Sequence, residues 1–317
     1  MTDLVTFGEA LLRLSPPRGD RLETARSFDV HVGGAESNVA AAASNLGLDA
    51  VWLSKLPDTA LGRRVVRELR AHGVRVGVSW TDDGRVGTYY LERGRRPREP
   101  NVVYDRRDST VTTAEASDLP LAIVRDAETC YVSGVTPARS QTLRETTATV
   151  LNLAAESGTR TVFGLHYEPD LWDPEEARAV YESLFPAVDV LVVAERDTER
   201  VLGREGPAVE RANGLAAEYG FDTVVMTRGE HGALALHGGE VQEQDAVEAD
   251  SYDDVGASDG FVGGFLAKRH EGGSVAEALE YATATAALER TLDGDVAVVA
   301  REDVESLIES ESDGVAR

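Results

Sequence analysis

Residues 253–265, with the sequence DDVGASDGFVGGF, place small residues and a carboxylate at the start of an expected helix. A turn of small residues at a helix start leaves backbone N–H groups free, and the helix dipole adds to their attraction, so this turn could hold an anion. Asp259 lies in the first helical turn, where its carboxylate could accept the proton of a hydroxyl that attacks a phosphorus centre. By itself the pattern is equally compatible with an ordinary helix start that contains glycine.

The elements that must position this turn alternate between short apolar runs and longer helical patterns. The expected strands cover residues 4–7, 51–53, 130–135, 161–165, 188–193 and 223–226. The expected helices cover residues 36–46, 61–72, 140–156, 174–184 and 207–219. Short buried strands that alternate with helices indicate an α/β fold, in which a mostly parallel sheet is covered on both faces. No repeat or low-complexity linker interrupts residues 1–317, so we expect a single domain.

The alternation changes between residues 78 and 113. Two expected strands, 87–92 and 101–106, are joined by a turn over residues 93–98. This pattern predicts a β-hairpin that stands off the main sheet and could act as a lid. The turn carries four arginines, and we interpret it as a solvated turn rather than an interaction patch.

The composition restricts the partners. The chain has 56 acidic and 32 basic residues, a net charge of −24, so it lacks the positive surface that nucleic acids or anionic membranes require. Only Lys55 and Lys268 are lysines, and an acidic, lysine-poor surface favours a halophilic host.

Cys130 is the only cysteine, so no intrachain disulfide can form, and its apolar neighbours predict a core thiol. A strand pattern begins at residue 4, with no leader pattern before it, and no segment approaches the length of a membrane span. Together these features lead us to expect a cytoplasmic protein.

Four segments resemble a known family. Residues 253–261 resemble the second signature of the ribokinase-like (PfkB-type) carbohydrate kinases, Asp-x-x-Gly-Ala-Gly-Asp-x-Phe, and residues 32–40 (VGGAESNVA) resemble the first. Between them, residues 58–62 (DTALG) and 227–233 (TRGEHGA) are similar to further family segments in the same order. The resemblance covers essentially the whole chain. It implies a ribokinase-like three-layer sandwich with a small β-hairpin lid, and ATP and Mg²⁺ as cofactors.

Within this family the chain is most similar to the kinases of 2-keto-3-deoxygluconate. The similarity rests on residues 8–14, 33–36 and 133–137 and on Tyr89, Tyr104 and Arg106. The residues that would contact the sugar acid by this resemblance are Gly34, Asn38, Tyr89, Tyr104 and Arg106. An arginine suits a carboxylate because it offers paired donors in a fixed geometry. The two tyrosines would close over the substrate and exclude water, although cross-strand aromatic residues can also simply stabilise a hairpin.

The resemblance also implies roles around the phosphate groups. Backbone N–H groups of Gly256, Ala257 and Ser258 would hold the developing charge, and Asp259 would be the base. The nucleotide would contact Thr227, Gly229, Gly232, Gly256 and Ser258, with adenine near the small-residue helix 282–287. Asp197 would serve magnesium through water, although a solvated helix carboxylate is an equally good interpretation. The family further implies a homo-oligomer.

The chain departs from the family at three places. Gly164, His166 and Glu168 stand where similar kinases carry Asp-x-Asn-x-Arg, so an expected substrate-side arginine is an acid, and Glu168 would repel a carboxylate. Ser258 replaces a glycine, which costs about 1 kcal/mol if the backbone needs positive φ there. Ala194 replaces a polar residue of the metal motif.

The resemblance therefore implies an ATP-dependent kinase that phosphorylates 2-keto-3-deoxygluconate, or its galactonate epimer, to the 6-phospho product. Two alternatives follow from the departures. One is a kinase of a neutral sugar such as fructose, in which Glu168 accepts hydroxyl hydrogen bonds. The other is a sugar-binding paralogue with weakened catalysis.

Overall fold

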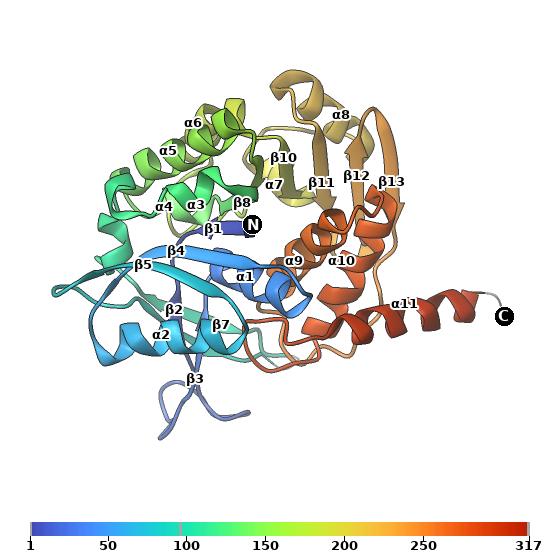
Figure 1. The fold of residues 1–317 in the computed structure, drawn as a ribbon. Helices are drawn as coiled ribbons and strands as arrows, with labels where there is room; N and C mark the ends of the chain where they lie inside the picture. The colour runs from blue at the N-terminus through green and yellow to red at the C-terminus, as the bar shows by residue number, and fades with distance from the viewer. Residues whose placement is uncertain (1, 95–96, 316–317) are drawn as a thin grey trace.

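A large twisted sheet forms the centre of the computed structural model, which describes residues 2–94 and 97–315 (Figure 1). Its strands are β1 (Thr2–Phe7), β4 (Ala50–Pro57), β5 (Arg75–Thr81), β8 (Ala127–Ser133), β9 (Arg160–Gly164), β10 (Val190–Ala194), β11 (Thr223–Thr227), β12 (Ala233–His237) and β13 (Glu240–Gln244). Their order across the sheet is β13-β12-β11-β10-β9-β8-β1-β4-β5. The strands from β5 to β11 are parallel, and β12 and β13 extend the sheet antiparallel.

Alternating side chains of each strand enter two separate cores. Leu4 and Val225 pack on one face, whereas their neighbours Val5 and Val224 pack on the other. The first face is covered by α1 (Ala35–Asn45), α2 (Ala60–Ala71), α9 (Ala257–His270), α10 (Val275–Glu289) and α11 (Arg301–Val315). The second face is covered by α3 (Ala122–Arg125), α5 (Gln141–Ser157), α6 (Pro174–Leu184) and α8 (Ala208–Tyr219). This three-layer arrangement confirms the expected α/β sandwich. The short helices α4 (Val135–Ala138) and α7 (Glu195–Arg200) follow β8 and β10.

Small residues bring α1 and α9 unusually close. A Cβ added to Gly263 would lie 2.6 Å from Cβ of Ala42, so only glycine fits at this contact. The alanine-rich segment of α1 is fully buried there. This close packing fixes α9, and with it the turn that precedes α9, against the first layer. The thiol of Cys130 lies in the second core with no exposed surface, as expected.

The lid is larger than the hairpin that the sequence predicts. The strands β2 (Leu11–Ser15), β3 (Asp29–Gly33), β6 (Thr88–Glu92) and β7 (Asn101–Asp105) form one small sheet in the order β3-β2-β6-β7. The hairpin β6–β7 therefore joins two strands from the N-terminal segment, one of which, β2, pairs with β6 in parallel. The expected hairpin off the main sheet is confirmed, but its two partner strands were not foreseen, because this pairing links segments more than 70 residues apart, which local patterns do not reveal. We call these four strands the lid sheet.

Contrary to the expectation from the sequence, the turn between β6 and β7 is not solvated along its whole length. Arg93 forms ion pairs with Asp253 and Asp293, and its side chain is only 10 % exposed, so this arginine is not solvated. Arg98 pairs with Glu92. Arg95 and Arg96 lie outside the described residues.

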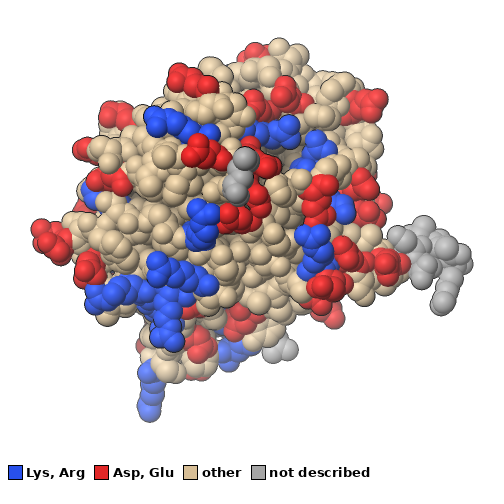
Figure 2. All heavy atoms as spheres, in the orientation of Figure 1, with Lys and Arg blue, Asp and Glu red and all other residues tan. Residues whose placement is uncertain are grey.

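Charge is unevenly spread over the surface. Figure 2 shows acidic side chains scattered across one face, with basic side chains gathered at its lower left, over α2. The sequence of α2 carries Arg63, Arg64, Arg67 and Arg70. Among the described residues, no helix combines the length and the apolar character that a membrane crossing needs.

Candidate active site

The turn before α9 separates two cavities. The lid cavity, of about 240 Å³, lies between this turn and the lid sheet. Its lining includes Gly34, Asn38, Tyr89, Tyr104, Arg106, His166, Glu168, Gly256, Ser258 and Asp259. The α10 cavity, of about 360 Å³, lies on the other side and is lined by Thr227, Gly229, Gly232, Ala257, Ser258, Thr283 and Ala286, among others. The structure thus brings the two expected groups of site residues to either side of one turn.

The geometry of this turn depends on Gly256. Its φ of +89° lies in the left-handed region, and a Cβ there would lie 2.4 Å from the carbonyl oxygen of Asp295. The next residues, Ala257 and Ser258, begin α9, so their N–H groups have no acceptor within the helix and point to its open end. Ser258 has ordinary helical backbone, and the expected strain at this position was wrong, since Gly256 alone takes the positive φ. Ser258 instead lines both cavities.

Asp259 lies directly behind the turn and is 7 % exposed. Its Oδ2 accepts a hydrogen bond from Nδ2 of Asn38 at 2.8 Å, and Oδ1 of Asn38 accepts one from the N–H of Gly34 at 3.1 Å. Burial raises the pKa of Asp259 to about 6, while His166 and the Asn38 amide act in the opposite direction. Asp259 is therefore ionised at neutral pH but close to its titration range, which suits a general base. The Asn38 amide, expected on the substrate, holds this carboxylate in place.

Arg106 and two tyrosines form the lid side of the same cavity. Tyr89 and Tyr104 are cross-strand partners on β6 and β7, with ring centroids 5.6 Å apart. The Arg106 guanidinium lies 4.0 Å from the Tyr104 ring and is ion-paired with Glu168. Its Nε is buried and has no hydrogen-bond partner among the described residues. The two tyrosines thus stabilise the hairpin and line the cavity at once.

Sequence reasoning assigned no role to Arg13, which fastens the lid sheet to the turn. Its side chain on β2 is completely buried and forms ion pairs with Asp253 and with Asp295 at 2.7 Å. Its guanidinium also donates to the Gly294 carbonyl at 3.0 Å. The Tyr89 hydroxyl donates to Asp295 as well. The strands β2 and β6 therefore both contact the chain segments that surround Gly256. A single arginine in the sequence could not reveal these long-range partners.

Glu289, at the end of α10, is a second residue that sequence reasoning missed. Its side chain packs against the turn, since a Cβ on Gly256 would lie 2.7 Å from Oε1 of Glu289. The residue is 1 % exposed, and its Oε2 has no hydrogen-bond partner within the described chain. Burial, followed by the nearby Asp259 and Asp295 charges, raises the pKa of Glu289 to about 8. It is therefore protonated at neutral pH, which keeps this acidic cluster from gaining one more negative charge.

Asp197 lies on α7, beside a smaller cavity of about 80 Å³ that also contacts Thr227, Ser258 and Asp259. It is 3 % exposed, so the interpretation as a solvated helix carboxylate was wrong. Burial raises the pKa of Asp197. A carboxylate that faces a small polar cavity beside both larger ones offers the hard oxygen ligand that Mg²⁺ or its bound water prefers, so the residues present fit that ion.

His166 connects these cavities. It lines both the lid cavity and the cavity at Asp197, and it favours the ionised forms of Asp259 and Asp197. Its φ of +34° is in the left-handed region, which is uncommon for a side chain without a local hydrogen bond. The imidazole forms no hydrogen bond or ion pair with a described residue, so its ring nitrogens can meet a ligand.

Comparison with known proteins gives concordant results. Residues 1–299 match the model of the "pfkB family carbohydrate kinase". A 2-dehydro-3-deoxygalactonokinase of Haloferax volcanii is 55 % identical over 99 % of each chain, and a 2-dehydro-3-deoxygluconokinase of Thermoproteus tenax is 30 % identical over 93 % of this chain and 90 % of its own. A crystal structure of 2-dehydro-3-deoxygluconokinase from Thermotoga maritima superposes with a TM-score of 0.93 at 34 % identity, covering 98 % of this chain and all of that one.

Replacing Arg13 tests the link between the lid sheet and the turn. In Arg13→Met, Asp253 and Asp295 lose their buried cation, so we expect the free energy of unfolding to fall by about 3–5 kcal/mol. Urea unfolding at constant potassium chloride measures this loss. The control is Arg75→Met, which removes an exposed pair with Asp49 and should cost about 1 kcal/mol or less. Equal losses in the two variants would contradict the assigned role.

The pKa of Glu289 predicts a pH dependence of stability. Between the ordinary carboxyl range and about pH 8, the folded protein holds a proton that the unfolded chain releases, so stability falls as pH rises. Glu289→Gln removes this contribution, and its stability relative to the unaltered protein should increase from pH 5 to pH 8, by at most about 1.4 kcal/mol per unit. Unfolding curves at each pH measure the difference. A difference that does not change with pH would show that Glu289 does not titrate as inferred.

Proposed function

The chain belongs to the pfkB family of carbohydrate kinases, and we propose that it transfers the γ-phosphoryl group of ATP to the 6-hydroxyl of a 2-keto-3-deoxy sugar acid. The gluconate-derived acid and its galactonate epimer are the two candidate substrates, because relatives are named for each, as 2-dehydro-3-deoxyglucono- and 2-dehydro-3-deoxygalactonokinase. The observation that carries the proposal is the position of Asp259. It lies at the turn between a cavity that contains Arg106 and a cavity lined by small residues.

The lid cavity offers the contacts that a sugar acid needs. Arg106 can bind the carboxylate, since its buried Nε has no acceptor within the described chain and a guanidinium offers five donors in a fixed geometry. Tyr89 and Tyr104 cover the same side of the cavity, and a substrate beneath them is shielded from water that would compete for the phosphoryl group. With its carboxylate at Arg106, a bound sugar acid would then reach Asp259 with the 6-hydroxyl at its other end.

The phosphoryl group would come from ATP bound on the other side of the turn, opposite the lid cavity. ATP would occupy the α10 cavity, with its adenine against Thr283 and Ala286 on α10 and its phosphates toward the turn. The carboxylate of Asp259 accepts the proton of the 6-hydroxyl as that oxygen attacks the γ-phosphorus, while the N–H groups of Gly256, Ala257 and Ser258 stabilise the charge on the transferred group. Magnesium, with Asp197 as its carboxylate partner through water, would neutralise charge on the ATP phosphates.

Glu168 moderates the charge of Arg106. It is ion-paired with Arg106, so the repulsion that its sequence position predicts is partly cancelled. A substrate carboxylate must share the guanidinium with Glu168, which lowers the gain from binding an anion. His166 lies in the same cavity and can form a hydrogen bond with the substrate. This arrangement is the specific reason to keep a neutral sugar as a second candidate substrate.

A phosphorylation assay with several acceptors tests the proposal. The purified protein in molar potassium chloride, with magnesium and ATP, should phosphorylate one or both keto-deoxy acids with a kcat/KM at least about a hundredfold above that for fructose or ribose. Asp259→Asn should lower kcat by a factor of about 100 or more while ATP binding, measured by calorimetry, persists. Asp58→Asn on the exposed surface is the control. A preference for fructose would identify the neutral-sugar kinase, and ATP binding without any turnover would identify a weakened paralogue.

The ionisation of Asp259 predicts the acid limb of the rate profile. Because the base must be deprotonated and burial raises the pKa of Asp259 to about 6, kcat/KM should fall about tenfold per pH unit below that value and level off above it. Initial rates from pH 5 to pH 8 at constant salt measure this limb. An inflection near pH 4 instead would mean that Asp259 is not desolvated as the structure indicates.

Replacing Glu168 tests how charge sets the choice of substrate. Glu168→Gln frees Arg106 while it keeps the size of the side chain, so KM for the keto-deoxy acid should fall several-fold with little change in kcat. The affinity for neutral sugars should not improve. The matched control is Glu176→Gln, which removes a carboxylate from a surface pair with Arg144. An unchanged KM in Glu168→Gln would place the substrate carboxylate away from this pair.

A further inference from the structure

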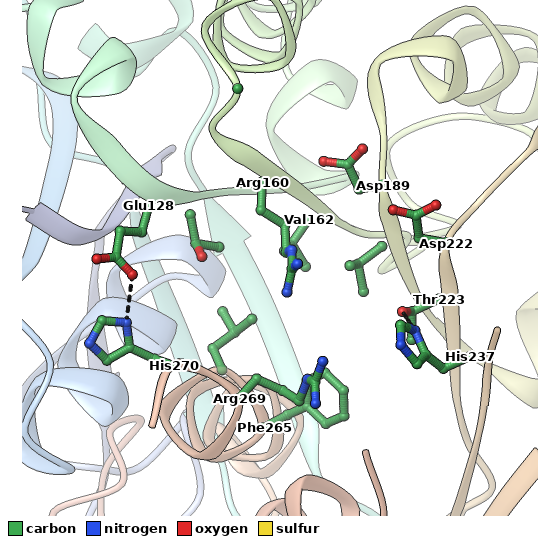
Figure 3. A pocket seen from close by; sticks show the side chains of 14 residues that line it. Glu128, Arg160, Val162, Asp189, Asp222, Thr223, His237, Phe265, Arg269 and His270 are labelled. Carbon is green, nitrogen blue, oxygen red and sulfur yellow. Dashed lines mark hydrogen bonds and ion pairs between the residues drawn. The ribbon is translucent and has the colours of Figure 1, made fainter. Parts of the chain in front are cut away.

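A separate cavity opens at the edge of the central sheet opposite the active site. This distal cavity has a volume of about 440 Å³ and lies against the first residues of β8, β9, β10 and β11 and the last turn of α9 (Figure 3). None of its lining residues lines the three cavities described above. Its volume falls within the range of small-molecule binding sites.

Two arginines that lack acidic partners point into the distal cavity. Arg160 enters from the start of β9 and Arg269 from the end of α9 (Figure 3). The side chain of Arg160 forms no ion pair or hydrogen bond with any described residue, and that of Arg269 donates only to the Gly273 carbonyl, at 2.6 Å. Burial, and then the positive charge of Arg160, lowers the pKa of Arg269, so the two guanidinium groups repel each other across the cavity. In a chain with 56 acidic and 32 basic residues, two arginines without a carboxylate partner in one cavity need an explanation.

The carboxylates around the distal cavity do not neutralise these arginines. Glu128 is paired with Nδ1 of His270 at 3.1 Å, at the far side of the cavity. Asp189 accepts hydrogen bonds from the N–H of Thr161 at 2.8 Å and from the hydroxyl of the same residue. Asp222 also lines the cavity, and its carboxylate forms no ion pair with a described arginine. The two guanidinium groups therefore remain available to an anion from solution.

The remaining lining residues suit a ligand that has an organic part as well as a charged group. Val162, Phe265 and Leu266 provide an apolar floor between the two arginines. His237, whose Nδ1 is hydrogen-bonded to the Thr223 hydroxyl at 2.8 Å, adds a polar wall. A compact organic anion with its charged group between the arginines would fill this volume, whereas a single inorganic ion would leave the floor uncovered.

We propose that the distal cavity binds a small organic phosphate, such as a sugar phosphate, with Arg160 and Arg269 as its two phosphate contacts. A phosphate group carries up to two negative charges and three oxygen acceptors, so it can bind both guanidinium groups at once. A single carboxylate has only two acceptor oxygens and one charge. The binding site is separate from the phosphate-binding turn, since the 14 residues of α9 place about 20 Å between its two ends.

Binding is measured with the proposed nucleotide cavity already filled. The full-length protein is saturated with magnesium and a non-hydrolysable ATP analogue in molar potassium chloride, and glucose 6-phosphate, inorganic phosphate and glucose are titrated in by calorimetry. Glucose 6-phosphate should bind, inorganic phosphate should bind more weakly, and glucose should not bind. In Arg160→Gln the affinity for glucose 6-phosphate should fall at least about tenfold, because a charge-assisted contact is lost. The side chain of Arg160 forms no ion pair or hydrogen bond within the described part of the chain, so this variant should fold normally.

Two further variants secure the interpretation. Arg269→Gln should also lower the affinity at least about tenfold, and its circular dichroism spectrum reports whether the last turn of α9 is kept without the bond to Gly273. The control is Arg125→Gln, another exposed arginine without an ion pair in the described chain, which should leave binding unchanged. The absence of any glucose 6-phosphate binding to the unaltered protein would overturn the proposal. So would equal affinities in Arg160→Gln and the unaltered protein, or an equal loss in Arg125→Gln.

Discussion

The buried guanidinium of Arg13 is the interaction on which the site depends most. It lies on β2 and binds Asp253 and Asp295, so one side chain holds the lid sheet against the chain on both sides of Gly256. A buried cation among acids is costly to remove but imposes a definite geometry while it stays. The hydroxyl of Tyr89 and the guanidinium of Arg93 contact the same acidic segments, so a change in the position of the turn at Gly256 displaces the lid sheet as well.

Much of the fold follows from local patterns. The alternation of apolar runs and helices predicts the parallel sheet, and the small residues near Gly256 predict the turn and Asp259. The pairing of β2 with β6 and the partners of Arg13 could not be predicted, because they join residues that are far apart in the chain. The ion pair between Arg106 and Glu168 could not be predicted for the same reason. The sequence suggested that Arg106 binds the substrate and that Glu168 repels it, but their contact with each other appears only in the folded chain.

Acidic residues act in two different ways in this molecule. On the surface they are numerous, exposed and screened by salt, in keeping with the similarity to a Haloferax protein. Around the turn they are buried and few, and their charge is limited by Arg13 and by the raised pKa of Glu289. The low dielectric makes each of these buried charges matter individually. The net charge of the chain therefore says little about the electrostatic field at the candidate active site, because a few buried ion pairs set that field.

Cys130 gives the protein a built-in reporter of unfolding. It is the only cysteine, it lies in the middle of β8 with no exposed surface, and burial raises the pKa of its thiol to about 12. The thiol lies in the core between the sheet and the helix layer that contains α3 and α5, so a thiol reagent can reach it only when this layer moves off the sheet. The rate of labelling at this single atom would thus follow the opening of the second core, without an added probe.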